Sequence, residues 1–425
     1  MRKFVVIWVG QLISTVGSGL TGFALSIWIF RETGQAAPFV YTALASSIPV
    51  ALFSLFAGAL ADRLNRRLLM ILADTGAALS TFVIFLLYTS GNLEVWHIYI
   101  SSFFASLCST FQIPAFNASI TMLVPKEQLT RANGMVQTGF SVEGLLSPVL
   151  AGLLVGIIGV EGMILIDFAT FFAAIGTLLA VQIPQPEMTE DKRTQTILNN
   201  IQSGWEFLSQ RQGLIALAGY IGLVNLFATS VMALTTPLIL SFSNERILGI
   251  AQMISSLGLL LGGIWISTSG GTKRKMTGIY LAVLISGLGL MFGGLRSIFW
   301  WIAIGMFIFL FPIPTTNSQL RSIIQVKVPP DLQGRVFSVV FLIARLGPPL
   351  GFLISAPLAD RIFEPGMLAD GIFASFFGPV FGTGPGRGIG LMLSLAGLGI
   401  WLTTAVMYVY PRLRLVEDEL PDVVQ

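Results

Sequence analysis

Charged residues are scarce in this chain. Lys, Arg, Asp and Glu make up 11% of its 425 residues, whereas hydrophobic residues make up 54% and the mean hydropathy is +0.82. Because a soluble globular protein carries about a quarter charged residues, this composition cannot cover a water-facing surface of that size. At roughly 20 residues per span, about twelve transmembrane helices fit into the length. The composition therefore predicts an all-α membrane protein.

Cysteine and histidine are almost absent, with one residue of each. Cys108 excludes an intramolecular disulfide, and its apolar surroundings indicate plain packing. His97, beside Trp96 at a predicted helix end, is interpreted as an interfacial residue, so we expect no metal site and no cofactor. No G-x-x-x-x-G-K-[ST] motif occurs, which argues against an ATP-driven pump. The net charge of +3 lies in scattered short loops and does not indicate a nucleic-acid partner.

Long apolar runs predict the individual spans and divide the chain into two six-helix bundles. Residues 1–183 form the first bundle, 184–212 a connection, 213–410 the second bundle and 411–425 a tail. The run after Met1-Arg2-Lys3 is interpreted as a retained first helix rather than a signal peptide, because many spans follow it. The predicted spans are 4–30, 38–60, 68–89, 96–119, 134–158, 162–183, 213–240, 247–268, 276–295, 298–320, 335–357 and 388–410.

Basic residues predict the orientation. Of the 24 Lys and Arg residues, Arg345 lies inside a span and all but five of the others fall on the side of the N-terminus. The positive-inside rule therefore predicts that both termini are cytoplasmic. The five on the opposite side are Arg31, Arg246, Arg296, Arg361 and Arg387.

The two predicted connections of about 30 residues differ in character. In the connection at 184–212, apolar residues at 197, 201, 205 and 208 recur at helical spacing, which predicts an amphipathic helix at the membrane surface. The segment 358–387, rich in Gly and Phe, is interpreted as an interfacial or re-entrant cap over the outer mouth.

A repeat relates the two predicted bundles. Ile113-Pro114-Ala-Phe-Asn117 recurs as Ile313-Pro314-Thr-Thr-Asn317. Val124-Pro125, followed by Arg131, recurs as Val328-Pro329, followed by Arg335. Parallel repeats of equal topology predict a pseudo-two-fold axis along the membrane normal.

One basic turn follows the pattern G-x-x-x-D-R-x-x-R-R, and it lies between the second and third spans. We expect its glycine to admit a neighbouring helix closely and its arginines to hold the turn in the cytoplasm. The alternative is an ordinary positive-inside loop that happens to contain an aspartate. The motif residues are Gly58, Asp62, Arg63, Arg66 and Arg67.

This turn resembles the signature loop of the major facilitator superfamily of secondary transporters, where it acts as a conformational gate. The run from Leu123-Val124-Pro125 to Gly134, and Arg345-Leu-Gly347-Pro348-Pro349, are similar to the macrolide-efflux and siderophore-export branch. The resemblance implies two bundles of six helices, alternating access, a bacterial inner-membrane location and a monomer.

The fifth predicted span carries small residues four apart, at Gly144, Pro148, Gly152 and Gly156. Such spacing predicts one flat face for close helix packing. It also resembles the antiporter signature of drug exporters, although Ser147-Pro148 stands where that signature has Gly-Pro. Generic tight packing explains the spacing equally well.

Ionisable residues inside the predicted spans are candidates for coupling to protons, because charge in the hydrocarbon region is costly. Glu143 lies roughly 14 Å deep in its span at 1.5 Å per residue. We hypothesise that Glu143 carries the proton and that Arg345 pairs with it in one conformation; a static buried pair is the alternative. Asp167 and Asp74 are further candidates, for which structural roles are favoured.

The resemblance implies a substrate cavity between the first, fourth, seventh and tenth spans. Neutral polar groups with abundant aromatics suit a lipophilic or amphipathic solute. The candidate lining residues are Gln11, Gln112, Asn117, Asn225 and Asn317.

Three functional hypotheses follow, and none of them is an enzyme. The first is a proton-coupled exporter of amphipathic drug-like molecules, with protons and membrane lipids as its other partners. The second is a dedicated siderophore or lysolipid transporter. The third, a non-transporting receptor or scaffold, predicts a sizeable soluble segment, whereas the longest connections have only about 30 residues.

Overall fold

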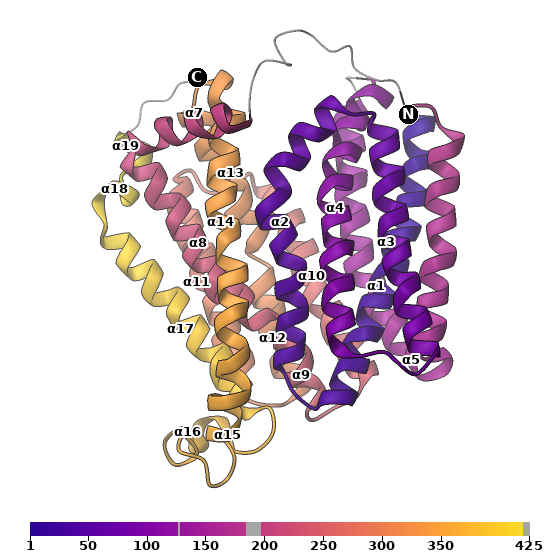
Figure 1. The fold of residues 1–425 in the computed structure, drawn as a ribbon. Helices are drawn as coiled ribbons and strands as arrows, with labels where there is room; N and C mark the ends of the chain where they lie inside the picture. The colour runs from indigo at the N-terminus through magenta and orange to yellow at the C-terminus, as the bar shows by residue number, and fades with distance from the viewer. Residues whose placement is uncertain (126–127, 184–196, 420–425) are drawn as a thin grey trace. The chain divides into compact units, whose positions relative to one another are not determined.

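The computed structural model describes residues 1–125, 128–183 and 197–419, and these residues are predominantly helical with no strand among them. The predicted all-α fold is confirmed. In the first half, long helices are joined by short turns (Figure 1). They are α1 (Arg2–Thr33), α2 (Ala37–Arg63), α3 (Arg66–Thr89), α4 (Val95–Leu123) and α5 (Leu129–Ala180).

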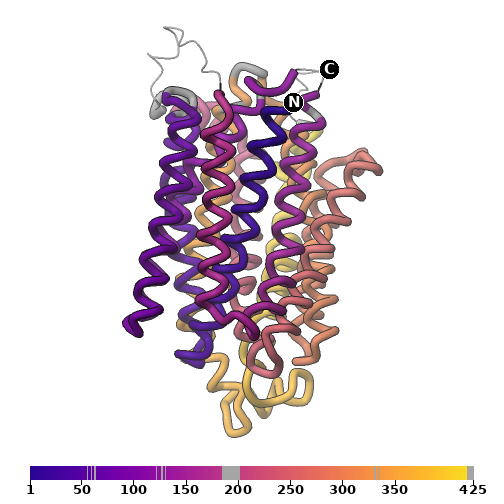
Figure 2. Tube along the Cα trace, turned by 90° about the vertical axis from the view of Figure 1, so that its right-hand side faces the viewer, coloured from indigo at the N-terminus to yellow at the C-terminus, as the bar shows by residue number. Residues whose placement is uncertain are grey.

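The helix α5 consists of two legs that reverse direction at Gly159. This residue has φ 67° and ψ −175°, a conformation that glycine adopts without strain. The first leg runs along α1 in the same direction, since Gly139 adjoins Trp8 and Ser147 adjoins Gly19. The second leg runs the opposite way, with Thr170 and Thr177 against Gly17 and Gly10 of α1. Both legs therefore flank α1, as Figure 2 shows.

Ten helical segments in the described residues are long and apolar enough to cross a membrane. One of them, Arg131–Ala180, has 50 residues, about 75 Å of helix, which is far beyond one bilayer core. Division at Gly159 makes it two spans. The 29-residue α4 is not among the ten because Ser, Thr, Gln and Asn lower its hydropathy. With both included, the described chain has twelve candidate spans.

Two predicted spans of the second half are broken. The span expected at 213–240 is α8 (Gln212–Met232) followed by α9 (Thr235–Leu240), and the span expected at 298–320 is α12 (Phe299–Leu310) followed by α13 (Ile313–Lys327). Pro312 and Pro314 favour the second break, because proline lacks the N–H that a continuing helix requires. The other long helices are α10 (Glu245–Ser269), α11 (Lys275–Gly294), α14 (Pro330–Leu358) and α17 (Arg387–Val409).

The sequence repeat has a structural counterpart at one of its two motifs. Val124 and Val328 both end a helix in extended conformation, with φ/ψ of −123°/131° and −117°/131°. A residue before proline is restricted to this region, which explains the agreement. The other motif differs, because Pro114 lies inside the continuous α4 whereas Pro314 lies in the first turn of α13.

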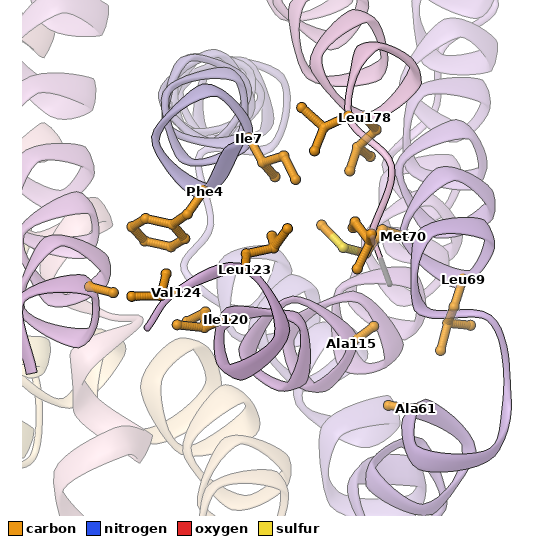
Figure 3. Packing of buried hydrophobic residues seen from close by; sticks show 13 residues of the cluster. Phe4, Ile7, Ala61, Leu69, Met70, Ala115, Ile120, Leu123, Val124 and Leu178 are labelled. Carbon is orange, nitrogen blue, oxygen red and sulfur yellow. The ribbon is translucent and has the colours of Figure 1, made fainter. Parts of the chain in front are cut away.

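The chain divides into two compact units. The first comprises Met1–Gly34, Tyr41–Gln195 and Glu245–Met253; the second comprises Gln35–Val40, Thr196–Asn244 and Ile254–Gln425. In the first unit, apolar side chains from α1, α3, α4 and α5 meet around Phe4, Ile7, Met70 and Leu178 (Figure 3). The amino group of Met1 donates to the carbonyl of Leu123 at 3.2 Å, so α1 begins beside the end of α4.

Glycines allow the helices of the second unit to pack closely. A Cβ added to Gly305 of α12 would lie 2.8 Å from the carbonyl oxygen of Gly289 in α11, and one added to Gly397 of α17 would lie 2.5 Å from that of Gly287. Backbone contact of this kind is typical of helix packing in lipid, where association depends on close fit.

The segment between α14 and α17 folds at one end of the second unit, with short helices η2 (Ala359–Phe363), α15 (Glu364–Gly366) and α16 (Ala374–Phe381) (Figure 1). Two of its carboxylates cap helix starts. Asp360 accepts the N–H groups of Ala36 and Ala37 at 3.0 and 2.8 Å, and Glu364 accepts that of Ile389 at 2.8 Å. The segment is thus held by helix N-termini, while its predicted role as a cap over the outer mouth stays a prediction.

The predicted amphipathic helix is α7 (Ile197–Ser209), while the preceding residues 184–196 lie outside the described chain. Its buried face differs in part from the expected one. Trp205 is half exposed, whereas Gly204, Phe207 and Leu208 are buried, and a Cβ on Gly204 would lie 2.6 Å from the carbonyl of Arg335 in α14. After α17, the chain forms α18 (Pro411–Arg414) and α19 (Val416–Glu419).

Candidate functional site

A cavity of about 320 Å³ lies inside the first unit, among α1, α3, α4 and both legs of α5. Three carboxylates line it, Asp74, Glu143 and Asp167, and they come from three different spans. The described lining residues include no Lys, Arg or His. The cavity therefore gathers three acidic side chains with no basic side chain in its described wall.

Asp74 ends a chain of hydrogen-bonded side chains across the cavity. The amide of Gln11 donates to the carboxylate of Asp74 at 2.8 Å, and the amide of Gln112 donates to the side-chain oxygen of Gln11 at 2.6 Å. Three helices, α1, α3 and α4, are connected in this way. Predicted lining residues Gln11 and Gln112 thus contact each other as well as the cavity.

Asp167, in the second leg of α5, is the most buried of the three carboxylates, with 6% of its surface exposed. The hydroxyl of Ser18 in α1 donates to its Oδ1 at 2.9 Å. The backbone carbonyl of Asp167 accepts a hydrogen bond from the hydroxyl of Thr170 at 2.8 Å. A partner on α1 therefore holds the side chain in place, as for Asp74.

Glu143, in the first leg of α5, differs from the two aspartates. Its side chain is half-buried, and within the described residues it has no hydrogen-bonding or ion-pairing partner. A Cβ added to Gly19 of α1 would lie 3.9 Å from its Cγ, so the side chain lies along a part of α1 that has no side chain of its own. Of the three acids, Glu143 is the one free to change partners.

Aromatic rings supply much of the apolar wall. Sequence reasoning anticipated aromatics in general but singled out none of these rings, because their spacing does not separate a cavity-facing ring from one that faces lipid. They are Trp8, Phe116, Phe140, Phe168 and Phe171.

The other predicted site residues lie in different surroundings. Asn117 lines the same cavity. Asn225, in α8 of the second unit, donates to the carbonyl of Ala344 at 3.2 Å, and Asn317 in α13 is exposed. Arg345 is exposed on α14, also in the second unit, so its pairing with Glu143 stays a prediction.

The basic turn between α2 and α3 is anchored by its two last arginines. Arg66 is buried and donates to the carbonyl of Ala118 at 2.7 Å. Arg67 donates to the carbonyls of Leu178 and Leu179, both at 2.7 Å. These carbonyls end the second leg of α5 and have no partner within their own helix, so a cation there is favourable.

Three other positions of this turn need separate mention. The side chains of Asp62 and Arg63 lie outside the described part of the structure. A Cβ on Gly58 would meet no described atom within 4 Å, so the close helix approach expected there is wrong for the described residues. Asn65, which the motif leaves unspecified, caps α3 by accepting the N–H of Leu68 at 3.1 Å.

The small-residue face of the first leg contacts the start of α10 within the first unit. A Cβ added to Gly152 would lie 2.8 Å from the carbonyl oxygen of Glu245, and one added to Gly249 would collide with the carbonyl of Pro148. At the same place, Arg31 of α1 forms an ion pair of 2.5 Å with Glu245. Gly152 and Pro148 are thus packing residues, whichever role the motif has in transport.

Comparison with known proteins agrees with this architecture. The family model of the Major Facilitator Superfamily matches residues 7–352. Macrolide efflux protein A of Streptococcus pyogenes is 30% identical over 365 residues, covering 85% of this chain and 90% of that protein. The multidrug efflux pump Tap of Mycolicibacterium fortuitum is 24% identical over 364 residues, covering 82% and 87%.

Solved structures share the fold. A bacterial homologue of the human lysosomal transporter Spinster superposes with a TM-score of 0.73 at 13% identity, covering 98% of each chain. A bacterial homologue of the iron transporter ferroportin gives 0.69 at 14% identity, covering 96% of this chain and 98% of the other. The chain is thus a multi-pass membrane transporter that belongs to the Major Facilitator Superfamily and resembles its macrolide and multidrug efflux proteins.

Proposed function

We propose that this transporter exports lipophilic molecules that carry a positive charge, in exchange for protons and by alternating access. The observation that carries the proposal is the cavity of the first unit, which has three carboxylates, five aromatic rings and no basic side chain among its described lining residues. An ionised carboxylate away from water is stabilised by a proton or by a cation. A lipophilic amine supplies the cation and an apolar body for the aromatic wall.

Differences among the carboxylates suggest a division of roles. Asp74 and Asp167 are held by Gln11 and Ser18, so they give the cavity a fixed polarity. Glu143 has no such partner in the described chain, and it is the residue on which proton and substrate compete. After the cationic substrate has left, Glu143 binds a proton and carries it inward. In one conformation, the charge of Arg345 stabilises the ionised Glu143 in place of that proton.

Two relatives support the export direction, since they are a macrolide efflux protein and a multidrug efflux pump. We place the transporter in a bacterial inner membrane as a monomer. We also propose that both termini face the cytoplasm, because all but six of the 24 Lys and Arg residues fall on the predicted side of the N-terminus. In the first unit, the turn at Arg66 and Arg67 is one such basic turn.

Efflux from proteoliposomes under an imposed pH gradient tests the proposal. A cationic macrolide and a cationic dye are compared with neutral molecules of similar size, for the wild type and for Glu143→Gln. Gradient-dependent efflux of the cationic molecules, lost in the variant, is the expected result. Equal efflux of charged and neutral molecules would refute the charge preference.

Intact gradient-driven transport by Glu143→Gln would refute its role as proton carrier. If no cationic molecule is exported by folded protein, a dedicated siderophore or lysolipid transporter becomes the better assignment. Asp167→Asn serves as a comparison. Ser18 holds Asp167 in place, so Asp167 is not the proton carrier in this proposal. We therefore expect this variant to bind the cationic substrate more weakly and to keep its coupling to protons.

A further inference from the structure

A second cavity, of about 480 Å³, lies in the second unit where α11 begins and α17 ends. The short helices α18 and α19 form one of its walls, at the end of α17 opposite to α15 and α16 (Figure 1). Charged and hydroxyl-bearing side chains dominate its lining. These are Lys273, Arg274, Thr277, Tyr280, Tyr408, Arg414, Glu417 and Asp418.

Three cations of this cavity have no acidic partner in the described chain. Lys273 and Arg274 are exposed and precede α11, and neither forms an ion pair with a described residue. The guanidinium carbon of Arg414 lies 6.0 Å from the centre of the Tyr408 ring, a cation–π contact that leaves its N–H groups available. All three can therefore donate to a ligand.

The acidic residues of the cavity do not neutralise these cations. Glu417 uses its two carboxylate oxygens for the N–H groups of Lys275 and Met276, at 3.0 and 2.9 Å, and so caps α11. Its backbone carbonyl accepts from the ammonium of Lys327, which fixes α19 in place. Glu417 and Asp418 together oppose three cations, so the described lining keeps an excess of one positive charge. The cavity is a preformed basic site with a net positive charge.

We propose that this cavity binds the phosphate group of an anionic phospholipid. Guanidinium and ammonium groups on a rigid frame are the usual partners of phosphate, and basic pockets at the ends of transmembrane helices suit lipid headgroups. A lipid is favoured over free phosphate because an apolar surface adjoins the cavity. On α17, Leu402, Val406 and Val409 recur at helical spacing and are exposed, and this apolar face ends beside Tyr408, which lines the cavity. Such a face can contact acyl chains.

Native mass spectrometry of the purified full chain tests this site. The protein is equilibrated with phosphatidylglycerol or with zwitterionic phosphatidylcholine, and the lipid that remains bound is counted. Arg274→Gln/Arg414→Gln removes two cations of the cavity. Arg131→Gln/Arg321→Gln is the matched control, because both residues are exposed and neither lines the cavity. Near-identical elution and helicity of the three proteins establish that they are folded.

We expect the cavity variant to bind phosphatidylglycerol about 25-fold more weakly, at roughly fivefold per cation, while the control binds as the wild type does. Equal retention by cavity variant and control would overturn the proposal. An inorganic phosphate arm separates the sources. The lipid assignment is wrong if inorganic phosphate raises the melting temperature of the wild type but not of the cavity variant, and phosphatidylglycerol raises the melting temperature of neither protein.

Discussion

The side-chain amide of Gln11 donates to the carboxylate of Asp74 across 2.8 Å, joining α1 to α3 inside the cavity of the first unit. Neither residue has an obvious reason to be in an apolar helix when considered alone. Together they satisfy each other, and Gln112 extends the chain to α4. This arrangement makes Gln11 a structural partner of the acid as well as a wall of the cavity.

Gln11→Leu removes the donor to Asp74 and leaves both the carboxylate and Gln112 without their partner. A buried polar group left unsatisfied costs about 1–3 kcal/mol, so the melting temperature in detergent should fall. Adding Asp74→Leu to Gln11→Leu should recover part of the lost melting temperature, because both partners are then apolar. Additive losses in the double variant would contradict the pairing.

Arg67→Ala frees two carbonyls at the end of α5. Hydrogen bonds from a charged group contribute about 1.5–3 kcal/mol, and this variant should therefore lower the stability of the first unit measurably in thermal unfolding. Arg131→Ala, at an exposed position of the same unit, is the control. Arg67→Lys should recover only part of the stability, since an ammonium cannot reproduce the two-pronged geometry that the guanidinium has on Leu178 and Leu179.

Two glycines of α5, four residues apart, predict opposite outcomes for the same substitution. Gly152→Ala places a methyl group 2.8 Å from the carbonyl oxygen of Glu245, which should cost about 1–3 kcal/mol and disturb the start of α10. Gly156→Ala meets nothing within 4 Å and should gain up to about 1 kcal/mol of helix propensity. Thermal unfolding and efflux assays of both proteins distinguish the sites. Equal behaviour would show that the contact with α10 is unimportant.

Local signals in the sequence were enough for the all-α class and for most helix ends. Val124 and Val328 illustrate this, because a following proline restricts each to the extended conformation that ends its helix. The break between α12 and α13 escaped prediction, although Pro314 pointed to it, because the similar Pro114 is tolerated within α4. Whether a proline breaks a helix depends on the packing around it.

The cavity could be predicted only in part. Glu143, Asp167 and Asp74 were candidates because ionisable groups are costly in apolar helices. Gln11 and Gln112 were candidates because the family resemblance implies a cavity beside their helices. That Gln11 donates to Asp74, and that Ser18 donates to Asp167, depends on how α1, α3 and α5 pack. Contacts between residues 63 or 149 positions apart leave no trace in a single sequence.

The reversal at Gly159 has a consequence for how this protein enters the bilayer during synthesis. From residue 153 to residue 166 the sequence contains a single charged side chain, Glu161. The translocation machinery therefore has almost nothing hydrophilic to carry across when the two legs of α5 insert. We infer that the legs enter together as one helical hairpin, with Gly159 as its tip.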